Sequence, residues 1–307
     1  MTGAAPSQSA VYGAPPAALA PVGADALQVS PWVPGAGRLE ALADGSLDRI
    51  WVVAPAGAVE RRYVLAQVLR ILRPGGELTA LAPKARGGLR LAGELAAFGC
   101  AVAERSKHHQ RICICARPPD PPGLAEAIQA GGPQLAPRLA LFSQPGIFSW
   151  DRVDAGSAAL IASDLTFKGR GADLGCGLGL LALEILKSPG VSELTLVDLD
   201  RRAVEAARRN IDDARARILH ADATAFAASA GELDFIVMNP PFHDEHGPNT
   251  AQGQAFINAA ARLLHPGGRL RMVANVALPY EAALGAAFKT VRELGRTGGY
   301  KIHEAIR

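Results

Sequence analysis

The sequence predicts an α/β protein of two related halves, the second folding as a doubly wound, mostly parallel sheet with helices on both faces. Two observations carry this prediction. From Gly169 onward, apolar strand-like stretches alternate with helical stretches, and such alternation indicates βαβ units. The 307 residues, of which 49% are hydrophobic and 20% charged, are also enough for about two globular domains.

The elements of the second half follow in order. The predicted strands are GRGADLGCG, ELTLVDLD, ARILHAD, LDFIVMNPP and RLRMVANV, and the predicted helices are GLLALEILKS, RRAVEAARRNID and QGQAFINAAARLLHPGG. The closing segment, FKTVRELGRTGGYKIHEAIR, is interpreted as a helix, a glycine turn and a last strand. Several strands end in acidic or asparagine residues, which places polar groups at one edge of the sheet.

Two segments rich in proline, glycine and alanine mark the domain borders. Residues 1–24 show no helical or strand period and are predicted to be a disordered tail. Residues 118–138 are predicted to be a linker, with a short helix at GLAEAIQA. The chain therefore divides into domains at 25–117 and 139–307.

The first half repeats the later part of the second. ILRPGGELTALA in the first half matches LLHPGGRLRMVA in the second. Just upstream of these segments, DRIWVVAPA matches DFIVMNPPF without a gap, and this alignment places Val53 opposite Asn239. We interpret the first half as a second, altered copy of the later strands of the same fold.

Charge, cysteine use and hydropathy narrow the class of protein. The net charge of +3 is compatible with an anionic partner but does not require one. The four cysteines form no C-x-x-C pair, so free buried thiols in a reducing compartment are expected. No stretch approaches the roughly 18 apolar residues of a membrane span. With no Lys or Arg before Arg38 to suggest a targeting segment, we expect a cytoplasmic protein without membrane contact.

Acidic residues and glycines follow three predicted strands. The loop DLGCGLG contains Asp173, Gly175, Gly177 and Gly179. It lies between a strand and a helix, where glycines let the backbone approach a ligand closely. After the next strand, the carboxylate of Asp198 or of Asp200 can accept both hydroxyls of a ribose. Asp222, after the third strand, is expected to receive an adenine amino group.

Together with NPPF at residues 239–242, these groups resemble those of the class I S-adenosylmethionine-dependent methyltransferases. The segment PG-x-F…D…GS before the first strand, and NPPFHD, further resemble the bacterial guanine-N2 methyltransferases that modify small-subunit rRNA (methyltransferase C type) or large-subunit rRNA (methyltransferase G type). The resemblance implies tandem Rossmann-like domains, of which the C-terminal one is catalytic, with a seven-stranded sheet, and the N-terminal one degenerate. It implies S-adenosylmethionine as cofactor and ribosomal RNA or a ribosomal subunit as partner. The internal duplication would let a monomer imitate a dimer.

The resemblance also implies a role for the PG-x-F segment, which lies over the cofactor in that family. By position, Phe148, Asp154 and Gly156 would contact the cofactor here. The alternative interpretation of DAGS is a capped start of an ordinary helix.

The NPPF turn suits methyl transfer from a sulfonium to an exocyclic amine, an in-line displacement that requires no metal. Beside the cofactor, the Asn239 side-chain oxygen and the Pro240 carbonyl would accept hydrogen bonds from the amine and orient it. Proline rings, including that of Pro241, keep the turn rigid next to the base. Phe242 stacks on a base pulled from its helix. His243 either shapes the base pocket or is an ordinary loop residue.

The first half is predicted to bind no cofactor and to perform no catalysis, because Val53 offers no acceptor for an amine. A basic segment in this half is expected to contact RNA phosphates, the alternative being a solvated basic surface. Its cations are Lys84, Arg86, Arg90, Arg105, Lys107 and Arg111.

Two alternatives stay open. One is N-methylation of adenine N6 in RNA or DNA, or of a protein glutamine, because these reactions also use an N/D-P-P-F/Y turn. The other is a non-catalytic RNA-binding or assembly protein with a relic methyltransferase fold. The intact Asp173, Asp198, Asp222 and Asn239 argue against a relic.

Overall fold

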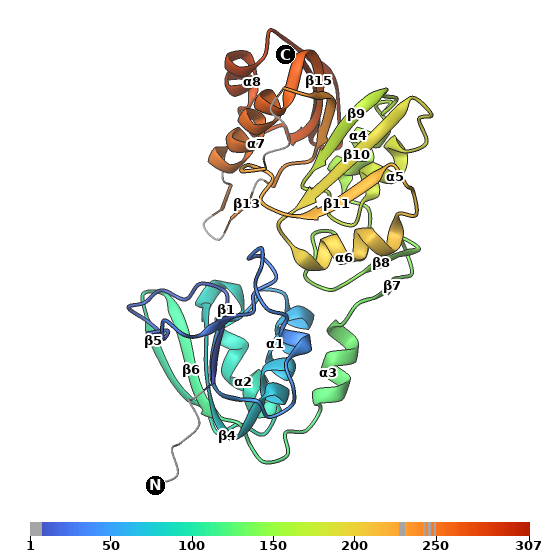
Figure 1. The fold of residues 1–307 in the computed structure, drawn as a ribbon. Helices are drawn as coiled ribbons and strands as arrows, with labels where there is room; N and C mark the ends of the chain where they lie inside the picture. The colour runs from blue at the N-terminus through green and yellow to red at the C-terminus, as the bar shows by residue number, and fades with distance from the viewer. Residues whose placement is uncertain (1–7, 227–230, 242, 245–246, 249) are drawn as a thin grey trace. The chain divides into compact units, whose positions relative to one another are not determined.

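The computed structural model describes residues 8–226, 231–241, 243–244, 247–248 and 250–307 (Figure 1). The chain divides into two compact units. Unit 1 extends to Pro133 and includes Gln144–Gly146, whereas unit 2 consists of Gln134–Ser143 and Ile147–Arg307.

Unit 2 is built on a seven-stranded sheet with the order β11-β10-β9-β12-β15-β17-β16. The neighbours are parallel except around β17, which is antiparallel to both β15 and β16. This confirms the predicted mostly parallel sheet. The strands are β9 (Gly169–Leu174), β10 (Val191–Asp198), β11 (Ala216–His220), β12 (Leu233–Met238), β15 (Leu264–Asn275), β16 (Thr290–Thr297) and β17 (Tyr300–Ile306).

Helices cover both faces of this sheet, and the period of two along each strand supplies a core to each face. In β15, Met272 packs in the core with α7 and α8, whereas its neighbour Val273 packs in the core with α4 and α5. The helices are α4 (Ala155–Ile161), α5 (Leu180–Ile185), α6 (Arg201–Asn210), α7 (Thr250–Leu263) and α8 (Glu281–Ala287). Two short hairpins complete the unit: β7 (Gln134–Ala136) with β8 (Leu141–Ser143), and β13 (His243–Asp244) with β14 (Gly247–Pro248).

The predicted helix in the closing segment is wrong, because that stretch is the edge strand β16. It pairs with β17 through a turn at Gly298 and Gly299, both of which have positive φ (56° and 83°). Most of its side chains are solvent-exposed, so the strand lacks the apolar alternation that identifies a half-buried strand.

Unit 1 contains a six-stranded sheet with the order β2-β1-β3-β4-β6-β5. The strands are β1 (Ser9–Tyr12), β2 (Leu27–Gln28), β3 (Leu47–Val53), β4 (Leu72–Pro83), β5 (Ala103–Lys107) and β6 (Gln110–Ala116). The helical elements are η1 (Leu39–Ala41), α1 (Ala58–Ile71), η2 (Lys84–Gly88), α2 (Leu89–Ala97) and α3 (Leu124–Gly131).

Two predictions about the borders of unit 1 are wrong. The predicted disordered tail contains β1, which is paired in parallel with β3 and whose Ala10 is fully buried. The predicted linker contains α3, which does form over GLAEAIQA but packs on α1, with Gly131 directly against Tyr63. Unit 1 therefore reaches to Pro133, and the domain border lies before Gln134 rather than at residue 139.

Strand pairing confirms that unit 1 is an altered copy of unit 2. Ile50 of β3 lies opposite Leu78 of β4, and Ile236 of β12 lies opposite Leu270 of β15, as the alignment requires. Equivalent elements have equal lengths: 14 residues in α1 and α7, 12 in β4 and β15, and 7 in β6 and β17. Val53 is therefore the counterpart of Asn239.

The pairing also reveals counterparts that the sequence comparison missed. Val11 lies opposite Trp51 in unit 1 as Asp173 lies opposite Val237 in unit 2, so a valine replaces that aspartate. By the pairing of β1 with β2, Ser30 corresponds to Asp198. Asp173 and Asn239 of unit 2 thus both correspond to valines in unit 1, Val11 and Val53. This supports the prediction that unit 1 binds no cofactor.

A buried arginine fills the end of β3 in unit 1. Arg61, the fourth residue of α1, is 1% exposed and is the counterpart of Gly253 in α7. Its Nη1 donates to the carbonyl oxygens of Pro55 and Ala56, and its Nε and Nη2 form a bidentate pair with Glu94 at 2.6 and 2.7 Å. Backbone carbonyls at this strand end are therefore satisfied from within the chain.

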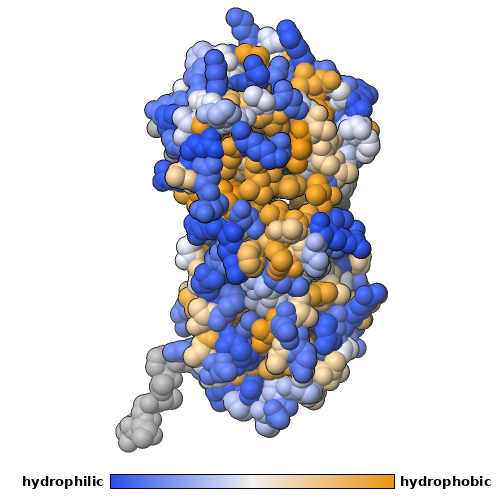
Figure 2. Space-filling model, turned by 90° about the vertical axis from the view of Figure 1, so that its right-hand side faces the viewer, coloured by the Kyte–Doolittle hydropathy of each residue, from blue (hydrophilic) through white to orange (hydrophobic). Residues whose placement is uncertain are grey.

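The surface drawn in Figure 2 mixes hydrophobic and hydrophilic residues. On this face, hydrophobic residues gather in the upper half, which belongs to unit 2. Within the described residues, no helix is both long enough and apolar enough to cross a membrane. Cys100, Cys113, Cys115 and Cys176 are free and buried, as predicted.

Candidate active site

A cavity of about 410 Å³ lies along the carboxyl edge of the unit 2 sheet. It brings together residues that follow four different strands: Asp222 after β11, Asp198 at the end of β10, Gly175 and Gly177 after β9, and Asn239 after β12. Parallel strands deliver such groups to one edge, because their carboxyl ends coincide. The remaining described lining residues are Phe148, Leu199, Ala223, Thr224, Pro240, Pro241, Gln252, Ala255 and Phe256.

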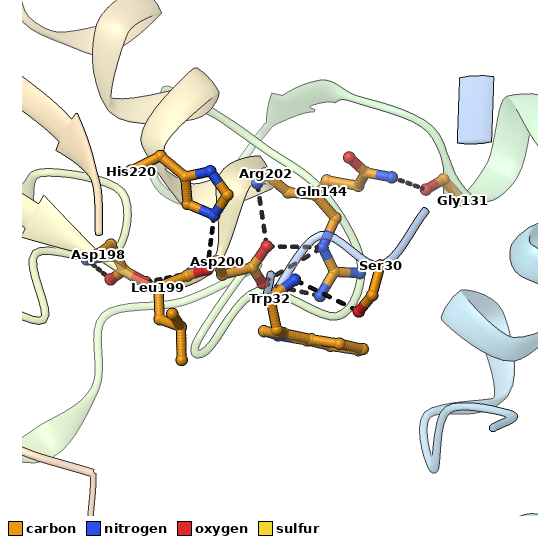
Figure 3. A network of polar contacts seen from close by, with 10 residues as sticks. Ser30, Trp32, Gly131, Gln144, Asp198, Leu199, Asp200, Arg202 and His220 are labelled. Atoms are coloured by element: carbon orange, nitrogen blue, oxygen red, sulfur yellow. Dashed lines mark hydrogen bonds and ion pairs between the residues drawn. The ribbon is translucent and has the colours of Figure 1, made fainter. Parts of the chain in front are cut away.

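Asp198, rather than Asp200, faces this cavity. Asp198 accepts from the amide of Gly177 at 2.8 Å and from that of Asp200 at 2.8 Å, which fixes its carboxylate across the glycine loop. Asp200 instead caps α6 and forms a bidentate ion pair with Arg202 (Figure 3). Of the two carboxylates, Asp198 is therefore the one that a ligand in this cavity can reach.

Asp173 lies beneath the glycine loop and does not line the cavity. Its side chain is fully buried, and neither carboxylate oxygen has a hydrogen-bond partner among the described residues. Burial, and secondarily the negative charge of Asp198, raise the pKa of Asp173 to about 8. Burial also raises the pKa of Asp198.

The pKa of Asp173 predicts a pH-dependent stability. In the unfolded chain this carboxyl titrates near pH 4, so between about 4 and 8 the folded protein holds a proton that the unfolded chain has lost. Its stabilising contribution is fully present below about pH 4 and is lost as the pH rises to about 8. Asp173→Asn stays neutral, so the urea midpoint of the ligand-free variant should fall less between about pH 5 and 8 than that of the wild type. The exposed control Asp212→Asn should follow the wild type, and equal falls in all three proteins would contradict this prediction.

Asn239 is held in one orientation by two residues of the segment before β9. Its Nδ2 donates to Asp154 Oδ2 at 2.8 Å and to Ser157 Oγ at 3.0 Å. A carboxylate can only accept, so the amide nitrogen must face Asp154 and Oδ1 must face away from it. Asp154 also caps α4 by accepting from the Ser157 amide at 2.9 Å. The helix cap and the positioning of Asn239 are thus two functions of one carboxylate.

A smaller cavity of about 60 Å³ adjoins the first. Phe148, Gly175, Gly177 and Asn239 line both cavities, and the Phe148 residue is 63% exposed. The rest of the described lining comprises Leu139, Leu141, Ser149, Arg152, Asp154, Ser157, Cys176, Leu178, Leu180 and Leu181.

Some predicted site residues lie elsewhere. Gly156 lines neither cavity: its Cα packs so closely that a Cβ would come within 2.9 Å of the Tyr300 ring. Gly179 begins α5 with φ 84°, and a Cβ there would meet Ile211 at 2.6 Å. We therefore interpret both glycines as packing residues. Phe242 and the side chain of His243 lie outside the described residues.

The basic residues predicted to bind RNA lie near the carboxyl end of β4 in unit 1. Pro83, which ends β4, pairs with Gln110, and Gln110 pairs with Lys107 across the next ladder. Lys84 and Arg86 follow in η2, Arg90 lies in the first turn of α2, and Arg111 lies in β6. Arg111 pairs with Glu104 at 2.8 Å, so part of its charge is neutralised. Glu94, conversely, is paired with the buried Arg61.

Comparison with known proteins identifies the family of this chain. A family model described as methyltransferase small domain matches residues 138–304. The ribosomal RNA small subunit methyltransferase C of Yersinia pestis (strain Pestoides F) is 31% identical over 262 residues, covering 82% of this chain and 72% of the relative. The chain belongs to the small-domain methyltransferase family. The methyltransferase C of Yersinia pseudotuberculosis serotype IB (strain PB1/+) is 30% identical over the same shares.

A solved member of this group shares the fold of both halves. The 16S rRNA N2 methyltransferase of T. thermophilus, in complex with AdoMet and guanosine, aligns with a TM-score of 0.73 and 25% identity. The alignment covers 88% of this chain and 76% of the other. The predicted family and the predicted Rossmann-like methyltransferase fold are therefore confirmed.

The residues of this family member fit the cofactor that the resemblance implies. Asp198 and Asp222 offer carboxylates at neighbouring strand ends, and the glycine loop leaves its backbone open between them. Sequence reasoning missed Ser157, although the D-x-x-S spacing of a helix cap was visible, and missed Leu199, which is 38% exposed beside Asp198.

Proposed function

We propose that the protein transfers a methyl group from S-adenosylmethionine to the exocyclic N2 of a guanine in 16S ribosomal RNA. The observation that carries the proposal is the fixed orientation of Asn239, whose Oδ1 is turned away from Asp154 at the edge of the larger cavity. The curated relatives act on small-subunit ribosomal RNA by name, and the solved T. thermophilus enzyme, named as an N2 methyltransferase and bound to guanosine, favours guanine N2 over adenine N6 or a protein glutamine. The same site argues against a non-catalytic relic.

The chain's own groups orient the amine. When bound, S-adenosylmethionine supplies an electrophilic methyl group on its sulfonium. The Oδ1 of Asn239 and the carbonyl of Pro240 accept hydrogen bonds from the two N–H groups of the amine, so that its lone pair points along the line of attack. Asp154 and Ser157 keep Asn239 from rotating, which makes them positioning residues for this step.

Transfer of labelled methyl groups tests the substrate. We expect incorporation into deproteinised 16S rRNA or into small ribosomal subunits, and not into 23S rRNA. Label in 23S rRNA alone would contradict the proposal. Because ribosomal RNA is the substrate, we infer action in the cytoplasm, and because each chain carries both units, action as a monomer.

We propose further that unit 1 holds the RNA through its basic residues. Simultaneous reversal of charge at Arg86, Arg90 and Lys107 to glutamate is expected to weaken rRNA binding by about tenfold or more. It should also flatten the salt dependence, because each lost phosphate contact removes about 0.7–0.9 from the logarithmic slope. Filter binding at several salt concentrations measures both quantities.

The matched control reverses two exposed arginines near the amino ends of strands of the same unit. Arg49→Glu with Arg73→Glu should leave the affinity and the slope nearly unchanged, since these residues already pair with Glu77 and Asp48. Equal weakening of rRNA binding in both variants would indicate a general effect of charge. It would contradict the proposal that the basic residues near the end of β4 hold the RNA.

A further inference from the structure

The smaller cavity differs from the larger one in its charged groups. Of its described lining residues, one is cationic, Arg152, and one is acidic, Asp154. Among the described lining residues of the larger cavity, the charged ones are two carboxylates, Asp198 and Asp222. The larger cavity thus suits neutral hydroxyl and amino groups. The smaller cavity offers a positive and a negative charge, which suits a zwitterion.

Strand order assigns an end of the cofactor to each cavity. Along the sheet edge, Asp222 follows β11, Asp198 ends β10, the glycine loop follows β9, and Asn239 follows β12. If adenine and ribose lie over the first two strands, the sulfonium must lie toward Asn239, where the amine is held. The amino-acid end then extends past the glycine loop, and the smaller cavity adjoins this loop through Gly175 and Gly177.

Arg152 is placed to exchange its present partner for a ligand. Its side chain is 68% exposed, and Nε donates to Asp151 at 3.0 Å. Such an exposed ion pair between sequence neighbours contributes little to the stability of the fold, so exchanging Asp151 for a ligand costs little free energy. The backbone is nevertheless anchored, because α4 begins only three residues later and is capped by Asp154. A guanidinium binds a carboxylate in two parallel hydrogen bonds, which a lysine cannot reproduce.

We propose that Arg152 binds the carboxylate of the amino-acid end of S-adenosylmethionine and thereby sets the position of the sulfonium. This inference rests on the proposed cofactor. It makes Arg152 a positioning residue, and it explains why a cation lies in an otherwise acidic and apolar site.

Calorimetry with two ligands tests the proposal. S-adenosylmethionine carries the amino-acid end, whereas 5′-methylthioadenosine has the same adenosine and sulfur without it. Arg152→Gln should weaken S-adenosylmethionine binding by about tenfold or more, the usual effect of losing a charge-assisted hydrogen bond. Binding of 5′-methylthioadenosine should change by less than about twofold, and Arg152→Lys should regain part of the lost affinity.

Arg296→Gln is the matched control, because Arg296 is similarly exposed (62%) and similarly paired with a nearby carboxylate, that of Glu293. It should bind both ligands like the wild type. Unchanged binding of S-adenosylmethionine to Arg152→Gln would overturn the inference, as would an equal loss for both ligands. Failure of the wild type to bind either ligand would instead refute the proposed function.

Discussion

Asn239→Ala is expected to lower the rate of methyl transfer by about two to three orders of magnitude, while S-adenosylmethionine binding stays within a few-fold of the wild type. Removal of a preorganised hydrogen-bonding group at the reacting centre has an effect of this size. The cofactor contacts assigned to Asp198 and Asp222 stay intact in this variant. Single-turnover transfer to rRNA and calorimetry together measure the two quantities.

Two further variants distinguish loss of the Asn239 orientation from a nonspecific disturbance of the sheet edge. Ser157→Ala removes one of the two partners of the Asn239 amide, so we expect a smaller loss of rate, about tenfold. Asn275→Ala changes an asparagine at the end of the neighbouring strand that lines neither cavity, and should leave the rate unchanged. Full activity of Asn239→Ala would remove this residue from the mechanism.

Arg61→Ala is expected to lower the free energy of unfolding of unit 1 by about 3–5 kcal/mol, the usual effect of removing one partner of a buried ion pair. The variant leaves Glu94 without its partner and the carbonyls of Pro55 and Ala56 without a donor. Urea unfolding followed by tryptophan fluorescence in a Trp150→Phe background measures the effect, since the other two tryptophans, Trp32 and Trp51, lie in unit 1.

An exposed arginine of the same unit supplies the control. Arg90→Ala should change the free energy of unfolding by less than about 0.5 kcal/mol. Free guanidinium at millimolar concentration should partly restore Arg61→Ala, because it fits the cavity that the side chain leaves. A loss below about 1 kcal/mol would show that Arg61 does not hold the end of β3 together.

The sequence was informative where a motif is tied to the end of a strand. The glycine loop and the NPP turn each follow an apolar run, so the residue pattern alone assigns both to one sheet edge. The ungapped match of DRIWVVAPA to DFIVMNPPF aligned Val53 with Asn239 in the register that the strand pairing shows, because an ungapped match between paired strands preserves register.

Other features depend on contacts between distant segments and left no local signal. β1 is only four residues long and lies among prolines and glycines, so its strand character comes from pairing with β3. The orientation of Asn239 depends on Asp154, which lies 85 residues earlier in the chain. The closure of the strand end in unit 1 by Arg61 likewise required the packed structure, since a charged residue in a helix is normally assigned to the surface.

The central claim is that Asn239 and Pro240 present a guanine N2 amine of 16S rRNA for methylation. Incubation of small subunits or 16S rRNA with methyl-labelled S-adenosylmethionine, followed by digestion and mass spectrometry of the nucleosides, tests it most directly. We predict label in N2-methylguanosine, and its loss in Asn239→Ala. Label in N6-methyladenosine, in protein, or in no product of the wild-type enzyme would contradict the account.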